Sequence, residues 1–197
     1  MRKPTTPSDK FRKLAGHPEI PVVHDREAAS PMFHVEVSHD DPVGTPDVIE
    51  YVRFLQSGSP GPHAYVILLG LRAFDAPKLF HLIDRGISFR ALDRLHQNTE
   101  ISLARIAEIV QIAPRTLTRR RQEGRLRPDE SDRLLRATRL FARALALFEG
   151  NVAAARRWLE SPQPALGGAV PTELARSEVG TLEVERAIGR IEHGVFA

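Results

Sequence analysis

The chain has 197 residues, of which 42% are hydrophobic and only 6% aromatic, and its formal net charge is +3. This length suits one sizeable domain or two small ones, and a core built from aliphatic residues favours helices. Cysteine is absent, which excludes disulfides, thiolate zinc sites and a cysteine nucleophile, and fits a cytoplasmic protein. No apolar run approaches the roughly 18 residues of a membrane helix, and none follows Arg2 and Lys3 as a secretory signal would require.

The first third of the chain is rich in proline, with nine of the fifteen prolines in residues 1–62. Proline breaks helices and lacks an amide donor. We therefore expect residues 1–62 to form an irregular, Pro-rich N-terminal extension, with disorder left open. One short amphipathic helix is expected inside it, over Asp47 to Gln56.

Helix start and stop signals become regular after Ala64. Asp75, Ser88, Asn151 and Thr181 are expected N-caps, and Gly124 is an expected stop. The predicted helices run over residues 76–85, 89–97, 103–110, 114–123, 128–149 and 152–160, then a short one from about 172, and finally 182–193. No strand pattern of comparable quality appears, so the predicted fold class is all-α.

The longest predicted helix, residues 128–149, is apolar over more than half of its circumference. Its main apolar stripe follows the 3.6-residue period and consists of Leu134, Ala137, Phe141, Ala144, Leu145 and Phe148. Leu135, Leu140 and Leu147 fall outside that stripe. We expect this helix to be the core of its own chain, with a dimer seam through Leu140 and Leu147 as the alternative.

Residues 103–122 have the proportions of a helix-turn-helix. Apolar residues fall on the inner face of the first helix and at the turn: Leu103, Ile106, Ala107, Val110 and Ile112. We place Leu117 facing inward in the second helix and step 100° for each residue. Arg115, Arg119 and Gln122 then point outward. Arg121 falls on the inner side, where we expect it to pair within the protein.

The second helix of this motif is strongly basic. Residues 101–127 hold seven arginines against two glutamates, a net charge of +5. Arginine bonds guanine edges and neutralises phosphates, so DNA contact is predicted, with a solvated basic face as the alternative. The residues expected to contact DNA are the outward ones and those on the flanks: Arg115, Thr118, Arg119, Arg120 and Gln122. One such helix covers only a half-site, so a homodimer is expected on operator DNA.

No catalytic constellation appears in the sequence. Of the eight histidines, only His34 and His39, beside Asp40 and Asp41, resemble a cluster of metal ligands. They lie in the Pro-rich extension without a helix to hold their spacing, so a solvated polar loop is favoured over a metal site. We therefore expect no catalytic residue, cofactor or metal, and an enzyme is the least favoured class.

A series of short motifs occurs in order over about residues 69–197. They are Arg115-Thr116-Leu117, Glu130-Ser131-Asp132-Arg133-Leu134, Ala154, Trp158-Leu159, Pro171, Gly180, Val184, Gly189-Arg190-Ile191-Glu192 and Gly194-Val195-Phe196-Ala197. In this order and spacing they resemble the MbcA/ParS/Xre antitoxin family, whose members pair with RES-domain toxins.

The resemblance implies an Xre-like helix-turn-helix DNA-binding domain, expected over residues 63–127, and a small helical toxin-binding domain, expected over residues 128–197. It implies an antitoxin that occludes the active site of a toxin that consumes NAD, while the complex represses its own operon. It adds Thr116 to the DNA-contacting residues. For the toxin it implies a set of contacts in the second domain: Trp158, Arg190, Glu192, Gly194, Val195, Phe196 and Ala197.

Two other functions stay open at this point. One is a stand-alone Xre-type repressor, in which the C-terminal domain only dimerises. The more distant one is a hydrolase or metalloprotein that uses the His-rich N-terminal third. Charge favours two different partners, because residues 171–197 hold five glutamates against three arginines, whereas the predicted recognition helix is basic.

The end of the chain generates a first prediction. Beyond Gly194 the sequence adds two large apolar residues, Val195 and Phe196, before Ala197. An apolar extension with a carboxylate at its tip suits a concave cofactor site in the toxin. Deleting residues 194–197 should leave folding and DNA binding intact and sharply weaken neutralisation. The measurement is NAD consumption by the toxin with either form titrated in. Equal inhibition by both forms would show that the tail is not the plug.

Overall fold

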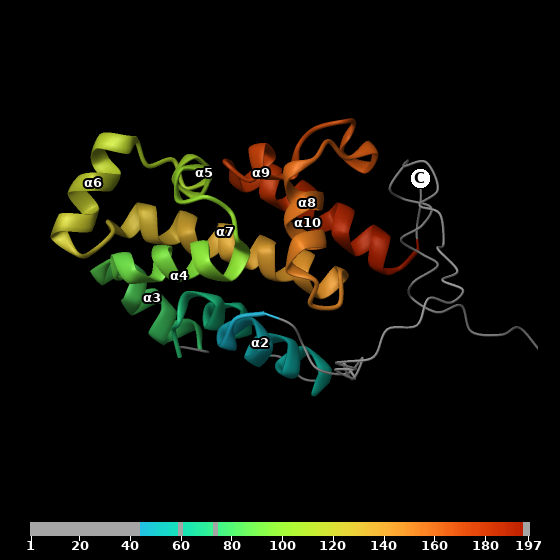
Figure 1. Ribbon diagram of the computed structural model, residues 1–197, viewed down its shortest axis with the longest axis horizontal. Helices are drawn as coiled ribbons and strands as arrows, with labels where there is room; N and C mark the ends of the chain where they lie inside the picture. The colour runs from blue at the N-terminus through green and yellow to red at the C-terminus, as the bar shows by residue number, and fades with distance from the viewer. Residues whose placement is uncertain (1–43, 59–60, 73–74, 195–197) are drawn as a thin grey trace, which may run out of the picture. The chain divides into compact units, whose positions relative to one another are not determined.

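Helices make up most of the chain that the computed structural model describes, which comprises residues 44–58, 61–72 and 75–194 (Figure 1). Within these residues no strand occurs, and the predicted all-α fold is confirmed. The elements are α2 (Pro46–Gln56), the 3-10 helix η1 (Ala64–Leu69), α3 (Ala76–Arg85), α4 (Phe89–Thr99), α5 (Leu103–Ile109), α6 (Pro114–Glu123), α7 (Pro128–Leu147), α8 (Val152–Glu160), the 3-10 helix η2 (Pro164–Leu166), α9 (Pro171–Leu174) and α10 (Glu178–Glu192). None of the described helices is long and apolar enough to cross a bilayer.

Most of the predicted helix starts are confirmed by their capping bonds. The Asp75 carboxylate accepts the Lys78 amide at 2.8 Å, and the Asn151 side chain accepts the Ala154 amide at 2.9 Å. The Ser88 hydroxyl accepts the Arg90 amide at 3.4 Å, at the predicted start of α4. These bonds satisfy amides that have no partner inside the helix.

The start of the last helix was predicted wrongly. Ser177, not Thr181, caps α10, and its hydroxyl accepts the Gly180 amide at 3.0 Å. Thr181 is buried inside the helix, where its hydroxyl donates to the Ser177 carbonyl at 2.9 Å. Gly180 lies in the first turn of this helix. A Cβ at that position would lie 2.0 Å from the Leu174 carbonyl oxygen, so glycine allows α10 to pack closely on α9.

Helix α7 is the central element of the core. It packs against η1, α3, α4, α8 and α10, and Figure 1 shows it running between α6 at one end and the C-terminal helices at the other. Leu134, Ala144 and Leu145 have no exposed surface. Leu140 and Leu147 are only 2% and 6% exposed. The alternative of a dimer seam through these two leucines is therefore wrong, because their own chain already covers them.

Helix α2 belongs to the same core. It lies in the compact unit that starts at Pro42, so the boundary drawn at residue 62 does not separate it from the later helices. The buried Tyr51 hydroxyl donates to the Ala142 carbonyl in α7 at 3.3 Å, and burial raises the pKa of Tyr51 to about 12. At the other end of α2, Asp47 is 4% exposed and accepts a bond from the Asn98 side chain at 3.0 Å. Residues 1–43 lie outside the described part of the chain.

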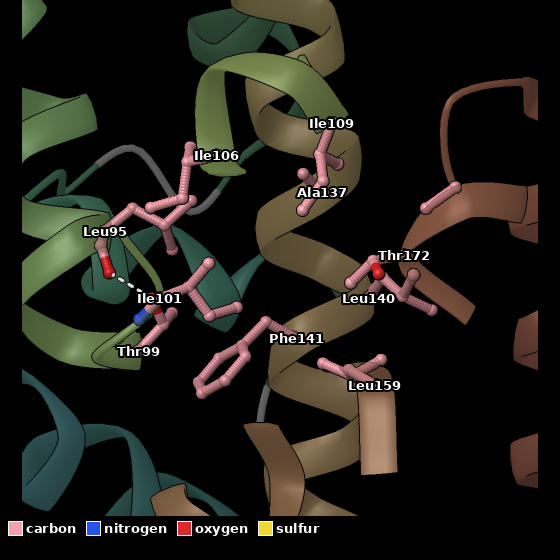
Figure 2. A pocket seen from close by; sticks show the side chains of 11 residues that line it. Leu95, Thr99, Ile101, Ile106, Ile109, Ala137, Leu140, Phe141, Leu159 and Thr172 are labelled. Atoms are coloured by element: carbon pink, nitrogen blue, oxygen red, sulfur yellow. Dashed lines mark hydrogen bonds between the residues drawn. The ribbon is translucent and has the colours of Figure 1, made fainter. Parts of the chain in front are cut away.

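The helices before and after α7 share one apolar interior. A small cavity of about 20 Å³ lies where they meet, and Figure 2 shows side chains from both halves pointing into it. Leu95 and Ile106 come from α4 and α5, Phe141 from α7, and Leu159 and Thr172 from α8 and α9. The volume exceeds that of a single water probe only slightly, so packing here is nearly complete.

The connection after α6 is fastened to the connection between α3 and α4. The Leu126 amide donates to the Ile87 carbonyl at 2.8 Å, and the Phe89 amide donates to the Gly124 carbonyl at 3.0 Å. Gly86 lies beneath this contact with φ +76°, and a Cβ there would meet the Leu126 carbonyl oxygen at 2.0 Å. The backbone approach therefore requires glycine at this position.

This contact predicts a large difference between two glycines that both have a positive φ. Gly86→Ala should destabilise the protein by at least about 3 kcal/mol, because a left-handed φ is combined with a clash against backbone. Gly124→Ala is the control: Gly124 also has a positive φ, +71°, but it lies in the left-handed helical region and has no atom within 4 Å of an added Cβ. It should cost about 1 kcal/mol. Urea denaturation of both variants measures the difference, and equal losses would contradict it.

Candidate functional site

The predicted helix-turn-helix is formed by α5 and α6. Ile106, Val110 and Ile112 are buried as expected, at 2%, 0% and 4% exposure. The Ile112 amide donates to the Ala107 carbonyl at 2.8 Å and closes the turn after α5. Pro114 then occupies the first turn of α6, where its missing amide hydrogen costs nothing.

Four of the predicted DNA-contacting side chains lie together on the exposed surface of α6. They are Arg115, Thr118, Arg119 and Gln122. Within the described residues Arg115 has no ion-pair partner, and Arg119 approaches only Glu123, at 3.7 Å with 55% of its side chain exposed. Thr116 is half-buried beside them. The helix therefore presents a basic face on which, in the part of the chain that the structure describes, Arg115 is unpaired and Arg119 is only weakly paired with Glu123.

Arg120 does not lie on this face, and its predicted flank position is wrong. Its side chain is 3% exposed and forms a buried ion pair with Glu130 at the start of α7, with 2.7 Å between Nε and Oε2. A second pair joins Arg120 to Glu123 at 2.6 Å. Arg121, predicted to face inward, is 60% exposed. The face of α6 that packs against the protein is thus centred nearer to Arg120 than to Leu117.

The Arg120–Glu130 pair holds α6 against α7. The hydrogen bond to Glu130 raises the pKa of Arg120 above its usual value, so the guanidinium stays charged. The same Glu130 oxygen also accepts the Arg127 amide at 2.7 Å. The Glu130 carboxylate therefore does two things: it caps the start of α7, and it neutralises Arg120 in α6.

Arg121 pairs within the protein, as predicted, although it does so on the surface. Its guanidinium lies 5.2 Å from the centre of the Phe89 ring and 3.3 Å from the Asp93 carboxylate, both in α4. An exposed contact of this kind contributes little to stability. It orients the C-terminal half of α6 without anchoring it.

The residues predicted to contact a toxin fall into two groups. Trp158 and Arg190 both contact the segment between α8 and α9, where the Trp158 carbonyl accepts from Gln163 at 2.7 Å and Arg190 donates to the Ala165 carbonyl at 3.3 Å. Trp158 is half-buried, so it is neither fully core nor fully surface. Glu192 faces α7 instead, 3.3 Å from Arg143. Gly194 is exposed, and Val195, Phe196 and Ala197 lie outside the described residues.

Three ion pairs join α7 to α10 in parallel order. They are Arg136–Glu178 at 2.8 Å, Arg139–Glu185 at 2.7 Å and Arg143–Glu192 at 3.3 Å. We call this set the α7–α10 ladder. Sequence reasoning missed it, although the glutamates recur every seven residues and the arginines every three or four, which would place each set on one helix face.

The ladder runs beside a groove that was also missed. This groove, the α2–α10 groove, has a volume of about 570 Å³. It is lined by side chains from α2, η1, α7 and α10, with Leu55, Tyr65, Ala146 and Leu182 among them. A groove assembled from four separate elements leaves no local signal in the sequence.

The C-terminal helices also contact the helix-turn-helix directly. The Arg105 guanidinium in α5 donates to the Thr172 hydroxyl at 3.1 Å and approaches Glu173 at 3.8 Å. Gln111, in the turn before α6, donates to the Arg176 carbonyl. The helix-turn-helix is therefore held by α7 through the Arg120–Glu130 pair and by the C-terminal segment through Arg105 and Gln111. In the described residues no group of His, Asp and Glu could hold a metal, and the His34–Asp41 cluster lies outside them.

The buried ion pair predicts unequal roles for two adjacent arginines. Arg120→Ala should destabilise the protein by about 3 kcal/mol, because it leaves the buried Glu130 carboxylate without its partner. Arg121→Ala, which removes the same charge from an exposed pair, should cost less than about 1 kcal/mol. Thermal denaturation followed by circular dichroism compares the two variants. Similar losses for both would show that the Arg120 pair does not anchor α6.

Comparisons with known proteins agree with this geometry. The model of the antitoxin Xre-like helix-turn-helix domain matches residues 79–139, and that of the antitoxin Xre/MbcA/ParS C-terminal toxin-binding domain matches residues 143–194. The chain is 39% identical over 130 residues to an antitoxin Xre of Yersinia enterocolitica, and 30% identical over 130 residues to one of Photorhabdus laumondii. Each alignment covers 66% of this chain and 88% of the relative.

A third relative, an antitoxin Xre of Pseudomonas putida, is 37% identical over 98 residues, which cover 49% of this chain and 61% of that protein. The two matched models meet within α7, between residues 139 and 143, so a single helix joins the helix-turn-helix to the toxin-binding domain. From these matches and the α5–α6 geometry, this chain belongs to the Xre antitoxin family.

Proposed function

We propose that this chain neutralises a RES-domain toxin through its C-terminal domain and represses its own operon through α6. It acts by binding in the cytoplasm, where both partners are found, and it catalyses no reaction. The observation that carries the DNA-binding part is the exposed basic face of α6. Family membership supports an antitoxin that combines a helix-turn-helix with a toxin-binding domain.

The exposed face of α6 suits insertion into the major groove. Arg115 and Arg119 present guanidinium groups that can bond guanine edges or phosphates, and Gln122 can bond adenine. The exposed Arg119–Glu123 contact is weak enough to exchange for a DNA contact. Thr116 and Thr118 are small polar neighbours suited to backbone phosphates. Since one recognition helix covers a half-site, the repressor acts as a homodimer whose seam lies outside Leu140 and Leu147.

The toxin-facing part of the proposal rests on the C-terminal helices. Trp158 and Arg190 each bond to the segment between α8 and α9, through the Trp158 carbonyl and the Arg190 guanidinium, and Glu192 is the last residue of α10. We propose that these residues hold the toxin while residues 194–197 enter its NAD site. The match to a toxin-binding domain favours this function over a repressor without a toxin partner.

The exposed arginines of α6 predict the effect of a double variant on DNA binding. Arg115→Ala with Arg119→Ala should weaken binding to the protein's own promoter at least about tenfold, because base contacts contribute roughly 1–3 kcal/mol each. A gel-shift titration measures the change. The matched control is Arg157→Ala with Arg186→Ala, which removes two positive charges from the exposed surface of α8 and α10.

The control separates specific contact from overall charge. If the control variant binds as the unmodified protein does, the loss in the α6 variant comes from the α6 face. Unchanged binding by the α6 variant would mean that another surface contacts DNA. Equal weakening of both variants would reduce the effect to net charge alone.

A further inference from the structure

The α2–α10 groove has an open mouth and a lining in which apolar side chains alternate with ion-paired charged ones. Leu55 in α2, Tyr65 in η1, Ala146 in α7 and Leu182 in α10 line it. Its volume of about 570 Å³ falls within the range of clefts that accept side chains from a partner. The groove is separate from α6, because none of its lining residues comes from the helix-turn-helix.

Exposed apolar residues gather at one wall of this groove. Among the described residues, three large hydrophobic side chains are exposed: Phe80, Val179 and Leu182. Two of them lie on α10, where Leu182 is 41% exposed in the groove and Val179 is 73% exposed beside it. Three residues apart on a helix, they share one face. Solvent-exposed apolar side chains next to a cleft are typical of a docking site.

The charges of the groove select the chemistry of its occupant. Its charged lining residues are Arg139, Arg143, Glu178, Glu185 and Glu192, and all five belong to the α7–α10 ladder. The ladder therefore leaves no unpaired charge in the groove for a charged peptide to neutralise. An uncharged segment that carries apolar side chains suits the groove, because those side chains can cover Leu55, Tyr65 and Leu182 without breaking an ion pair.

One wall of the groove belongs to the domain whose family model is a toxin-binding domain. Ala146, Leu182 and Glu192 fall within residues 143–194, which that model matches. The opposite wall, formed by Leu55 in α2 and Tyr65 in η1, precedes residue 79 and lies outside both matched models. The groove therefore joins a surface of the toxin-binding domain to a surface of α2 and η1 that neither family model includes.

We propose that the α2–α10 groove is a docking site for an apolar segment of the toxin, with α2 as its second wall. This inference rests on the proposed function and adds to it a contact surface separate from Trp158, Arg190 and the chain end. Helix α2 then has a role in toxin recognition as well as in the core. The toxin is held along α10 on one side and along α2 on the other.

The test uses one variant from each wall and the RES-domain protein encoded beside this gene. Leu182→Arg and Leu55→Arg each place a charge in the groove, and each should weaken toxin binding at least tenfold in isothermal titration calorimetry. Phe80→Arg is the control: it puts the same charge on an exposed apolar residue of α3, outside the groove. It should change the dissociation constant less than twofold. Thermal denaturation checks that all three variants fold.

Hydrogen–deuterium exchange on the unmodified protein gives a second measurement that does not depend on a variant folding. Toxin should protect the amides of α2 and α10 and leave α3 unchanged. If Leu55→Arg binds normally, or α2 gains no protection, the two-walled groove is wrong while the toxin–antitoxin pair still stands. If the unmodified chain does not bind the toxin, the proposed function fails, and the docking site fails with it.

Discussion

Helix α7 is the element on which the rest of this structure depends. It is buried along most of its length, and helices from both ends of the chain pack against it. An interior helix of this kind must satisfy its polar side chains locally, and the Thr138 hydroxyl does so by donating to the Leu134 carbonyl at 2.7 Å. Because α7 contacts η1, α3, α4, α8 and α10, the DNA-facing and toxin-facing surfaces are positioned by one rigid element.

Helix α6 is held by a different force, since it has little apolar surface to bury. Leu117 is only half-buried, and no aliphatic side chain of α6 is fully covered. The Arg120–Glu130 pair takes the place of a hydrophobic anchor. A buried pair fixes orientation more strictly than an apolar contact, because both hydrogen-bond directions must be met. The basic outer face can then point away from the protein at a defined angle.

The sequence was informative wherever structure is local. Capping side chains such as Asp75 and Asn151 determine helix starts through bonds to amides three residues away, and these were predicted correctly. The all-α class and the helix-turn-helix followed from the same signals. Family resemblance supplied the two domains, which no periodicity could have identified.

Apart from the Ser177 cap, which is local, the errors concern residues whose partners lie in another element. Arg120 is buried because it pairs with Glu130, ten residues later in α7. A helical wheel of α6 that places Leu117 inward includes no information about that partner. Leu140 and Leu147 are covered by neighbouring helices, and the apolar pattern within α7 does not predict where those helices pack. The groove and its ladder require four elements to be brought together, so their existence was not visible in the sequence.

The meeting of the two family models inside α7 limits how such proteins can diversify. Recombination at the point where one model ends and the next begins would cut a continuous helix between residues 139 and 143. It would also separate Arg136 and Arg139 from Glu178 and Glu185, their partners in α10. An exchange of halves therefore has to preserve both the continuity of α7 and the charges on either side of the junction. Substitutions on the two outer surfaces carry no such requirement, because neither surface includes the junction.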